Sequence, residues 1–325
     1  PLPVGPDQSA VKIMGVMGET LTLSAPKTSD AVYVVQQAGT GGTQQVVKFQ
    51  ADGGTADAAQ AGVNSTFWVE GQAGRADLPE GVTAVRASAT APDGSIWMVA
   101  DLDQDLGAQP IKGQSDVALL KVDKAGRVVS SQVLGAASQA NGYALAVAPD
   151  GRVAVAGSVI GALDDGKSGD AAGVADSFVT VFDATGQEQW TQRRGARAAD
   201  EATAVSFGAD GVVYVAGRSK SAMSGASAVG GWDGYVQAYS SRQANALAPF
   251  TATNIATRQF GSTGDDSVQA ITVSGSDLYT AGIENGRAVV RRFTLDEAGR
   301  PDPGAPLSGG GPGCGGPGGG PLGRG

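Results

Sequence analysis

The chain has 325 residues and a formal net charge of −9, from 23 Lys and Arg against 32 Asp and Glu, with no histidine and one cysteine. The lack of histidine removes the commonest general base and metal ligand, and a single cysteine excludes zinc sites, Cys–His nucleophiles and disulfides within the chain. The acidic balance disfavours a surface that follows nucleic-acid phosphates, and no apolar run approaches the length of about eighteen residues that spans a membrane.

The first predicted elements are four strand-like runs between Glu19 and Gly71, namely ETLTLSA, AVYVVQQ, QQVVKFQADGG and STFWVEG. They alternate apolar and polar residues with a period of two, as half-buried strands do. No Asp-Gly turn follows the first run. We interpret this stretch as a degenerate first unit of the repeat that follows it.

From Thr83 onward, a unit of about sixty residues recurs four times. Each copy has an apolar alternation, a tight turn, a second apolar alternation and a small residue: TAVRASATAPDGSIWMVA, YALAVAPDGRVAVAG, ATAVSFGADGVVYVAG and SVQAITVSGSDLYTAG. The closing small residues are Ala100, Gly157, Gly217 and Gly282, which gives steps of 57, 60 and 65 residues. A fixed period of this size is typical of repeat folds, in which each unit buries its faces against its neighbours.

Each complete unit holds four strand-like runs, and the unit that starts at Tyr143 reads YALAVAP, RVAVAGSV, SFVTVFD and EQWTQRR. Asp150-Gly151 predicts a hairpin turn between the first two runs, and the stretch Asp183 to Gly186 joins the last two. Repeated antiparallel sheets of four strands are the blades of a β-propeller. We therefore expect an all-β fold, a single β-propeller of about five four-stranded blades over residues 1–300, with almost no helix.

The two ends of the predicted ring are irregular. The last unit has strand-like runs to about Leu295 and then DEAGRPDPGAP, so we expect its fourth strand to be missing. An N-terminal run such as Ser9 to Val16 would complete that blade and close the ring. Residues 301–325 are rich in Gly and Pro, and we expect a disordered tail there that can be removed without loss of stability.

The blocks IKGQSDVALLKVD, APDGRVAVAGSV, DSFVTVFDATGQEQWTQRRGA and FGADGVVYVAGRSKS resemble bacterial β-propeller repeats of the SBBP type. In combination, WTQRRGARAADEA and KGQSDVALLKVD are similar to the propeller region of alphaproteobacterial flagellar regulatory proteins, over roughly Val11 to Phe293. This resemblance implies a flagellum-associated module that acts in trans on the expression of flagellin and chemotaxis genes.

Asp101, Asp103 and Asp105 form the sharpest candidate metal site, because carboxylates at alternate positions of a short loop resemble a calcium-binding loop. The pattern is incomplete, since Gly107 comes one place late and Lys112 stands where a calcium loop has a bidentate glutamate. A solvated acidic loop between strands is the favoured interpretation. We expect no metal, no cofactor and no catalytic residue, and hence no enzyme.

Asp116, Asp176 and Asp233 open the third strand of three successive units, and Asp123 and Asp183 follow two of them seven residues later. Such recurrence favours a structural role, in which the carboxylate accepts N–H groups of the preceding loop, over a ring of ligand-binding groups. The recurring glycine of the second strand is expected to let strands approach closely near the propeller axis.

Arg193, Arg194 and Arg197 form the one dense basic patch, and two acidic residues follow directly. Charges that protect an edge strand from aggregation are favoured here over a phosphate contact. Trp190 and Trp232 are expected to pack between blades, as large apolar residues of propeller repeats do.

Two functions from different classes remain open. The first is a non-enzymatic interaction module with protein partners, flagellar components among them, that regulates gene expression indirectly and not by binding DNA. The alternative is a secreted or surface propeller that acts on carbohydrates or binds a ligand at its central channel, which converging carboxylates about 5 to 10 Å apart would favour. We expect a monomer without a membrane span. Composition slightly favours an exported or flagellum-associated location over a cytosolic one.

Overall fold

The computed structural model describes residues 10–14, 20–24, 31–37, 44–50, 74–136, 138–161, 174–194 and 198–307. Over these residues the protein is built of strands and turns without a helix, as the sequence predicts. The strands form five antiparallel sheets that follow one another in chain order, one of five strands and four of four strands. We call them sheets 1 to 5.

Sheet 1 contains β1 (Ala10–Met14), β2 (Thr20–Ser24), β3 (Ala31–Gln37), β4 (Gln44–Gln50) and β5 (Gly74–Asp77). Sheet 2 contains β6 (Val82–Thr90), β7 (Ile96–Leu102), β8 (Asp116–Val122) and β9 (Val128–Leu134). Sheet 3 contains β10 (Gln139–Val147), β11 (Val153–Ile160), β12 (Ala175–Phe182) and β13 (Glu188–Arg194). Sheet 4 contains β14 (Asp200–Phe207), β15 (Val213–Ser219), β16 (Asp233–Gln243) and β17 (Phe250–Phe260). Sheet 5 contains β18 (Ser267–Ser274), β19 (Asp277–Glu284), β20 (Arg287–Thr294) and β21 (Ala305–Pro306).

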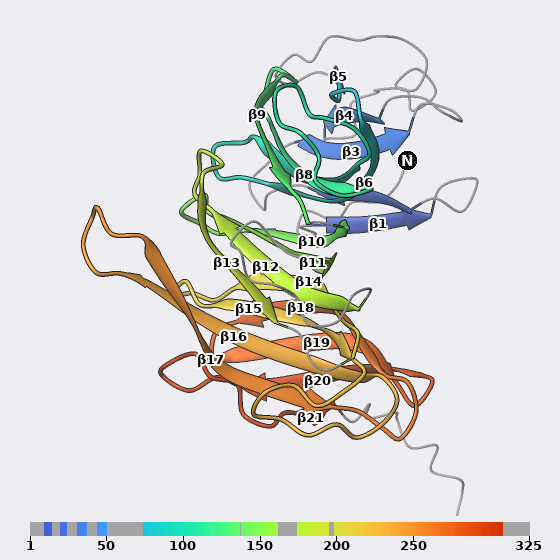
Figure 1. Cartoon of the computed structure of the whole chain (residues 1–325), viewed down its shortest axis with the longest axis vertical. Helices are drawn as coiled ribbons and strands as arrows, with labels where there is room; N and C mark the ends of the chain where they lie inside the picture. The colour runs from blue at the N-terminus through green and yellow to red at the C-terminus, as the bar shows by residue number, and fades with distance from the viewer. Residues whose placement is uncertain are drawn as a thin grey trace, which may run out of the picture.

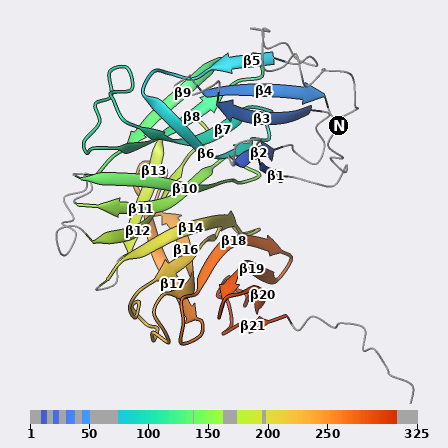
Figure 2. The ribbon, with the colours of Figure 1, turned by 90° about the vertical axis from the view of Figure 1, so that its right-hand side faces the viewer.

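The sheets are arranged along the long axis of the molecule, with sheet 1 at one end and sheet 5 at the other in both views (Figure 1; Figure 2). From sheet 2 onward, the first strand of each sheet contacts the first strand of the next: β6 meets β10, β10 meets β14 and β14 meets β18. The described strands of sheets 1 and 5 do not pair with each other. In both views the five described sheets form a row (Figure 1; Figure 2).

The prediction that Ser9 to Val16 completes the last sheet is wrong. Within this run, β1 pairs with β2 in sheet 1. Three of the runs expected in the degenerate first unit correspond to β2, β3 and β4, and the fourth, STFWVEG, lies outside the described residues. The fourth strand of sheet 5 is β21, which pairs with β20, so the last unit is not truncated.

The turn that leads to β21 has a sequence signal that repeats an earlier one. Asp296 begins the segment DEAGR, which matches DKAGR from Asp123 and DATGQ from Asp183. The Asp296 carboxylate accepts the N–H groups of Ala298 and Arg300 at 2.9 and 2.8 Å, so it closes the same turn between the third and fourth strands. The prolines that follow DEAGR had argued against a strand there, although the aspartate and glycine of this segment predict a hairpin turn.

Residues 301–307 belong to the fold, although we expected a disordered tail from 301 onward. The Asp302 carboxylate accepts the N–H of Thr294 at 3.0 Å. From sheet 4, Arg258 donates to the carbonyl oxygen of Pro301 at 2.9 Å. The remainder of the expected tail, from 308 onward, lies outside the described residues.

The turns between the first and second strands of sheets 2, 3 and 4 share one construction. Asp93, Asp150 and Asp210 each accept the backbone N–H two residues further on, at 2.9, 3.1 and 3.3 Å. The glycine that follows each aspartate has a φ between +78° and +87°, a conformation that glycine adopts without a steric penalty. The Asp-Gly hairpins predicted from the sequence are confirmed.

The recurring glycine of the second strand lies against a β-bulge in the first strand. A Cβ at Gly157, Gly217 or Gly282 would overlap a carbonyl oxygen of the first strand, that of the residue just before its pairing partner. Beside each glycine the pairing register shifts by one residue, for instance between Ala202 and Ala204. The predicted close approach of strands is confirmed, and only glycine permits it.

Sheets 3 and 4 illustrate how the apolar core is built between neighbouring sheets. We call the face of a sheet that meets the next sheet its forward face, and the opposite one its back face. The forward face of sheet 3 contributes Ala154, Ala156 and Val179, and the back face of sheet 4 contributes Val215 and Tyr239. Strands β11, β12 and β15 are buried along almost their whole length, and β16 is buried from Asp233 to Tyr239, because both of their faces are covered there.

Replacing Gly217 by alanine tests the close approach at the bulge. We expect Gly217→Ala to lower the free energy of unfolding by about 2 kcal/mol or more, because the new methyl group meets rigid backbone. Urea unfolding followed by circular dichroism measures this. Gly264→Ala is the matched control, since the nearest atom to its Cβ is 3.5 Å away, and a change of less than about 0.5 kcal/mol is expected. Equal effects of the two substitutions would contradict this account.

Shortening the chain tests the contribution of β21. A chain that ends after Pro301 loses the β20–β21 pairing and the Asp302–Thr294 hydrogen bond that a chain ending after Leu307 retains. We expect the shorter chain to be less stable by about 1 to 3 kcal/mol in urea unfolding. Superimposable unfolding curves would show that the last sheet does not need its fourth strand.

Candidate functional site

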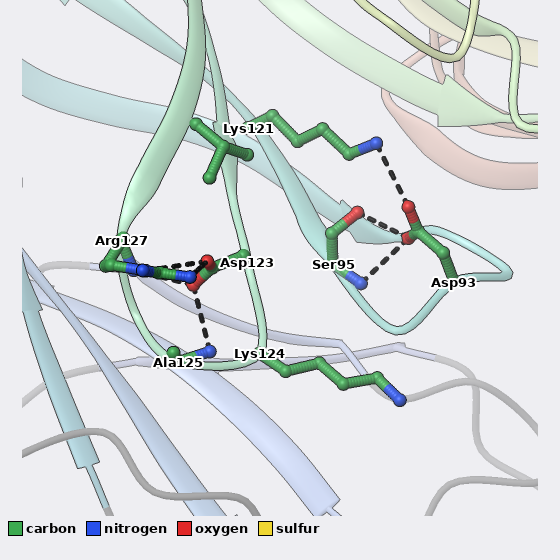
Figure 3. A pocket seen from close by; sticks show the side chains of 8 residues that line it. Asp93, Ser95, Lys121, Asp123, Lys124, Ala125 and Arg127 are labelled. Atoms are coloured by element: carbon green, nitrogen blue, oxygen red, sulfur yellow. Dashed lines mark hydrogen bonds and ion pairs between the residues drawn. The ribbon is translucent and has the colours of Figure 1, made fainter.

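A polar depression of about 360 Å³ lies where two turns of sheet 2 meet (Figure 3). One turn, 91–95, joins β6 to β7, and the other, 123–127, joins β8 to β9. The lining residues are Asp93, Ser95, Lys121, Asp123, Lys124, Ala125, Arg127 and Val129. The volume is within the range of small-molecule sites, and five of the eight lining residues are charged.

Turn 123–127 is folded by its own aspartate. One oxygen of Asp123 accepts the N–H groups of Ala125 and Arg127, both at 2.9 Å. The other oxygen accepts the Arg127 side chain through Nε, also at 2.9 Å. The local sequence alone therefore places a carboxylate and a guanidinium side by side at the edge of the depression.

Lys121 connects this depression to the neighbouring sheet. Its Nζ lies 3.0 Å from a carboxylate oxygen of Asp93 and donates to the carbonyl oxygen of Ala184, in a turn of sheet 3, at 3.0 Å. The same ammonium group lies 5.2 Å from the centroid of the Trp97 ring. Lys121 is thus engaged within the fold, and Figure 3 shows its side chain directed toward Asp93.

The carboxylates of the depression are kept ionised. Burial raises the pKa of Asp93, but hydrogen bonds from Ser95 and Lys121 outweigh it and hold that pKa below its usual value. Burial likewise raises the pKa of Asp123, and the hydrogen bonds and charge of Arg127, together with a hydrogen bond from Ala125, lower it overall. Carboxylates of this kind have no proton to donate near neutral pH. The arrangement therefore suits contact with a polar partner, and the Arg127 side chain, 77% exposed, is accessible to one.

The structure does not bring the calcium candidates Asp101, Asp103 and Asp105 together. Asp101 is ion-paired with Arg86, and a carboxylate oxygen of Asp105 accepts the N–H of Ile111 at 3.0 Å. Asp103 is exposed. Across the part of the chain that the structure describes, no group of three His, Cys, Asp or Glu residues could hold a metal ion.

Two of the recurring aspartates have the structural role that the sequence predicts. Asp116 accepts the N–H of Lys112, in the preceding loop, at 2.7 Å. Asp233 accepts the N–H groups of Val229 and Gly230 at 2.7 and 2.8 Å. Both carboxylates are fully buried, so each fixes the loop that leads into its strand.

The third recurring aspartate explains the basic patch. Arg193 donates to Asp176 at 2.6 Å, and the two side chains are only 7% and 10% exposed. Its guanidinium also donates to the carbonyl oxygen of Gly161 at 2.5 Å. Arg193 is therefore an internal ion-pair partner and not an edge-protecting charge. The side chain of Arg194 and all of Arg197 lie outside the described residues.

The two tryptophans differ. Trp190 packs between sheets 3 and 4, 6.1 Å from the ring of Tyr239, which confirms the prediction. Trp232 instead lies at the end of the β15–β16 loop, with Arg218 and Lys220 at 4.3 and 4.9 Å from its ring centroid. The Trp232 side chain is half-buried, and its ring lies against these two cations.

Sequence reasoning missed two aspartates that join successive sheets. Asp200, at the start of β14, accepts the N–H of Ser177 of sheet 3 at 3.0 Å. Asp266, just before β18, donates its own N–H to the carbonyl oxygen of Trp232 at 2.6 Å. The available signal was their spacing, since they precede the recurring glycines Gly217 and Gly282 by 17 and 16 residues.

These observations define a class: an all-β repeat protein of stacked antiparallel sheets, with a charged depression at its turns. No protein-family model matches the chain, so the resemblance to SBBP-type repeats stays a prediction. The chain is 41% identical over 319 residues to Regulatory protein FlaEY of Caulobacter vibrioides, which confirms the resemblance predicted to a regulatory protein. The match covers 90% of this chain and 32% of that protein, so the chain spans about one third of the length of this curated relative.

Among solved structures, the extracellular domain of a one-component system from B. thetaiotaomicron matches with a TM-score of 0.37 and 12% identity. That match covers 88% of this chain and 32% of the other chain. At this TM-score the likeness carries no argument about fold or function. Within the described residues, no helix is long and apolar enough to cross a membrane.

The pH dependence of stability tests the aspartate turns. The pKa of Asp183 lies below its usual value. Burial raises it, but hydrogen bonds from Thr185 and Gln187 outweigh burial, and the pKa values of Asp93 and Asp123 are lowered in the same way. Because the unfolded state then binds more protons, stability is present above about pH 4 and falls as the pH drops below it. We expect Asp183→Asn to lower the midpoint of unfolding at pH 7. Near pH 2.5 the midpoints of the variant and the parent protein should become similar.

Thermal unfolding between about pH 2.5 and pH 7 measures both chains. Asp103→Asn, which alters an exposed aspartate outside these turns, should leave the midpoint at pH 7 unchanged. A constant difference between Asp183→Asn and the parent over the whole range would show that the carboxylate charge does not stabilise the turn.

Proposed function

We propose that the chain is a regulatory, non-enzymatic interaction module and that its sheets are successive blades of a β-propeller. The observation that carries the regulatory part is the 41% identity to Regulatory protein FlaEY over 90% of the chain. By that resemblance, the module belongs to the flagellar system and acts in trans on flagellin and chemotaxis gene expression. It acts through protein contacts and not by binding DNA.

The propeller part is supported by the arrangement of the strands. First strands β6, β10, β14 and β18 lie next to one another on one side, and each sheet extends from there to its fourth strand. Bulges in the first strands, with a glycine opposite each in the second strand, let the strands approach closely on this side, as they must near a propeller axis. The open row in Figure 1 corresponds to an arc of such a propeller.

The charges support protein contact over catalysis and over DNA binding. The chain has no histidine, and Asp93 and Asp123 are held ionised beside cations, so acid–base chemistry lacks a suitable donor at the depression. A net charge of −9 opposes binding to phosphates. Arg193 of the basic patch is buried in an ion pair with Asp176 and does not face solvent.

Binding to DNA is tested directly by fluorescence anisotropy with labelled flagellin promoter DNA and a scrambled duplex, at about 150 mM salt. We expect no preference for the promoter. A preference of about tenfold or more would overturn the proposal of indirect action.

The role of the depression is tested in cells that carry this gene. The double variant Lys124→Glu, Arg127→Glu reverses two cations at the depression, and Arg242→Glu reverses one exposed cation elsewhere. With thermal stability unchanged, we expect the double variant to alter flagellin transcript levels in the direction of a gene deletion and Arg242→Glu to have no effect. Normal transcript levels in the double variant would exclude the depression as the regulatory contact.

A further inference from the structure

The forward face of sheet 5 repeats the chemistry of a face that is buried elsewhere. In sheet 4, Ala216 pairs with Val236, and both are fully buried under sheet 5. In sheet 5 the equivalent pair is Ala281 with Val290, and Val290 is 45% exposed. The position is the same in each case, one residue before the recurring glycine. An alanine–valine pair that is covered in one sheet is thus uncovered in the next.

Neighbouring positions extend the match. One step along the strand pair, Tyr214 lies opposite Ala238 in sheet 4, and Tyr279 lies opposite Arg292 in sheet 5. Next to the alanine–valine pair on the forward face, Ile283 is 39% exposed. Three of these four positions, the tyrosine, the alanine and the valine, therefore carry the same residue on a covered face and on an uncovered one.

Tyr214 shows what such a face does when it is covered. Its hydroxyl donates to the carbonyl oxygen of Gly299, in the turn between the third and fourth strands of the following sheet, at 2.7 Å. The hydroxyl of Tyr279 lies 3.5 Å from Asp277 of its own sheet. A further sheet with the same turn would give Tyr279 the carbonyl partner that Tyr214 has.

The shape and the charge of the forward face of sheet 5 indicate which kind of surface could cover it. In the interface between sheets 4 and 5, small side chains such as Ala216 of the forward face meet large ones such as Leu278 and Phe293 of the back face. Two forward faces would therefore fill each other poorly, which disfavours a second copy bound face to face. The charges on the face, Asp277 and Arg292, pair with each other at 3.0 Å, so no charged partner is required.

We propose that the forward face of sheet 5 is a docking surface for a further four-stranded unit of this same repeat, which presents its large apolar back face. The interface between sheets 4 and 5 is built in this way, and this surface is the next one in the series. A unit of this kind cannot bury its back face alone, so docking and folding of the added unit are one event.

The test supplies such a unit. A copy of residues 261–307, which carries the linker and all four strands of sheet 5, is fused after Gly325 of the full chain. Both the parent and the extended chain carry Cys314→Ser and Val290→Cys, which leaves one thiol on the proposed surface. Val129→Cys, at a position that is 55% exposed on β9, is the control. The reaction rate with a thiol reagent is measured in each chain.

We expect the thiol at position 290 to react at least about tenfold more slowly in the extended chain, with the control rate unchanged. Placing aspartate in the added unit at the position copied from Leu278 should restore the fast rate. Equal reaction rates of the thiol at position 290 in the parent and the extended chain would overturn the proposal. This holds whether the added unit is folded or unfolded, because in either case it would not cover the surface. A parent chain that dimerises and thereby protects position 290 would also overturn it.

Discussion

Both faces of the second and third strands of a unit are apolar, and the rest of the structure depends on this constraint. In sheet 3, β11 and β12 are buried almost from end to end, which no single sheet could achieve in water. Each unit therefore needs a neighbour on either side. The row of sheets in Figure 2 is the consequence, and the uncovered forward face of sheet 5 is the same constraint left unmet at one end.

Stacking sheets this closely requires the strands on one side to converge. The glycine at the end of the second strand and the bulge opposite it allow this, since a Cβ at Gly217 would overlap the carbonyl oxygen of Glu201. Convergence brings the start of one sheet next to the third strand of the previous one. Buried carboxylates such as Asp200 then satisfy backbone N–H groups across the junction. An unpaired group there would cost about 1 to 3 kcal/mol.

Polar chemistry is left to the turns, where it is largely self-contained. The Arg127 side chain donates to the Asp123 carboxylate within the same turn, and Lys121 of β8 donates to a carbonyl oxygen in a turn of the next sheet. The carboxylates of this depression are ionised, and we propose that it meets a partner through its pattern of charges. This agrees with a regulatory role exercised through contact, as proposed from the similarity to Regulatory protein FlaEY.

The sequence by itself determined the all-β architecture, the four-stranded unit, its Asp-Gly turns and the recurring glycine, because each depends on bonds between residues a few positions apart. It also contained the DEAGR signal for the last hairpin, which the surrounding prolines obscured. Only the tertiary structure decided which charges meet. Asp101 pairs with Arg86, so the three calcium candidates are not assembled, and Asp176 pairs with Arg193, so that arginine is not a free charge of the predicted basic patch. Side-chain partners are chosen by neighbours in space, and a spacing in the sequence does not specify those neighbours until the sheets have stacked.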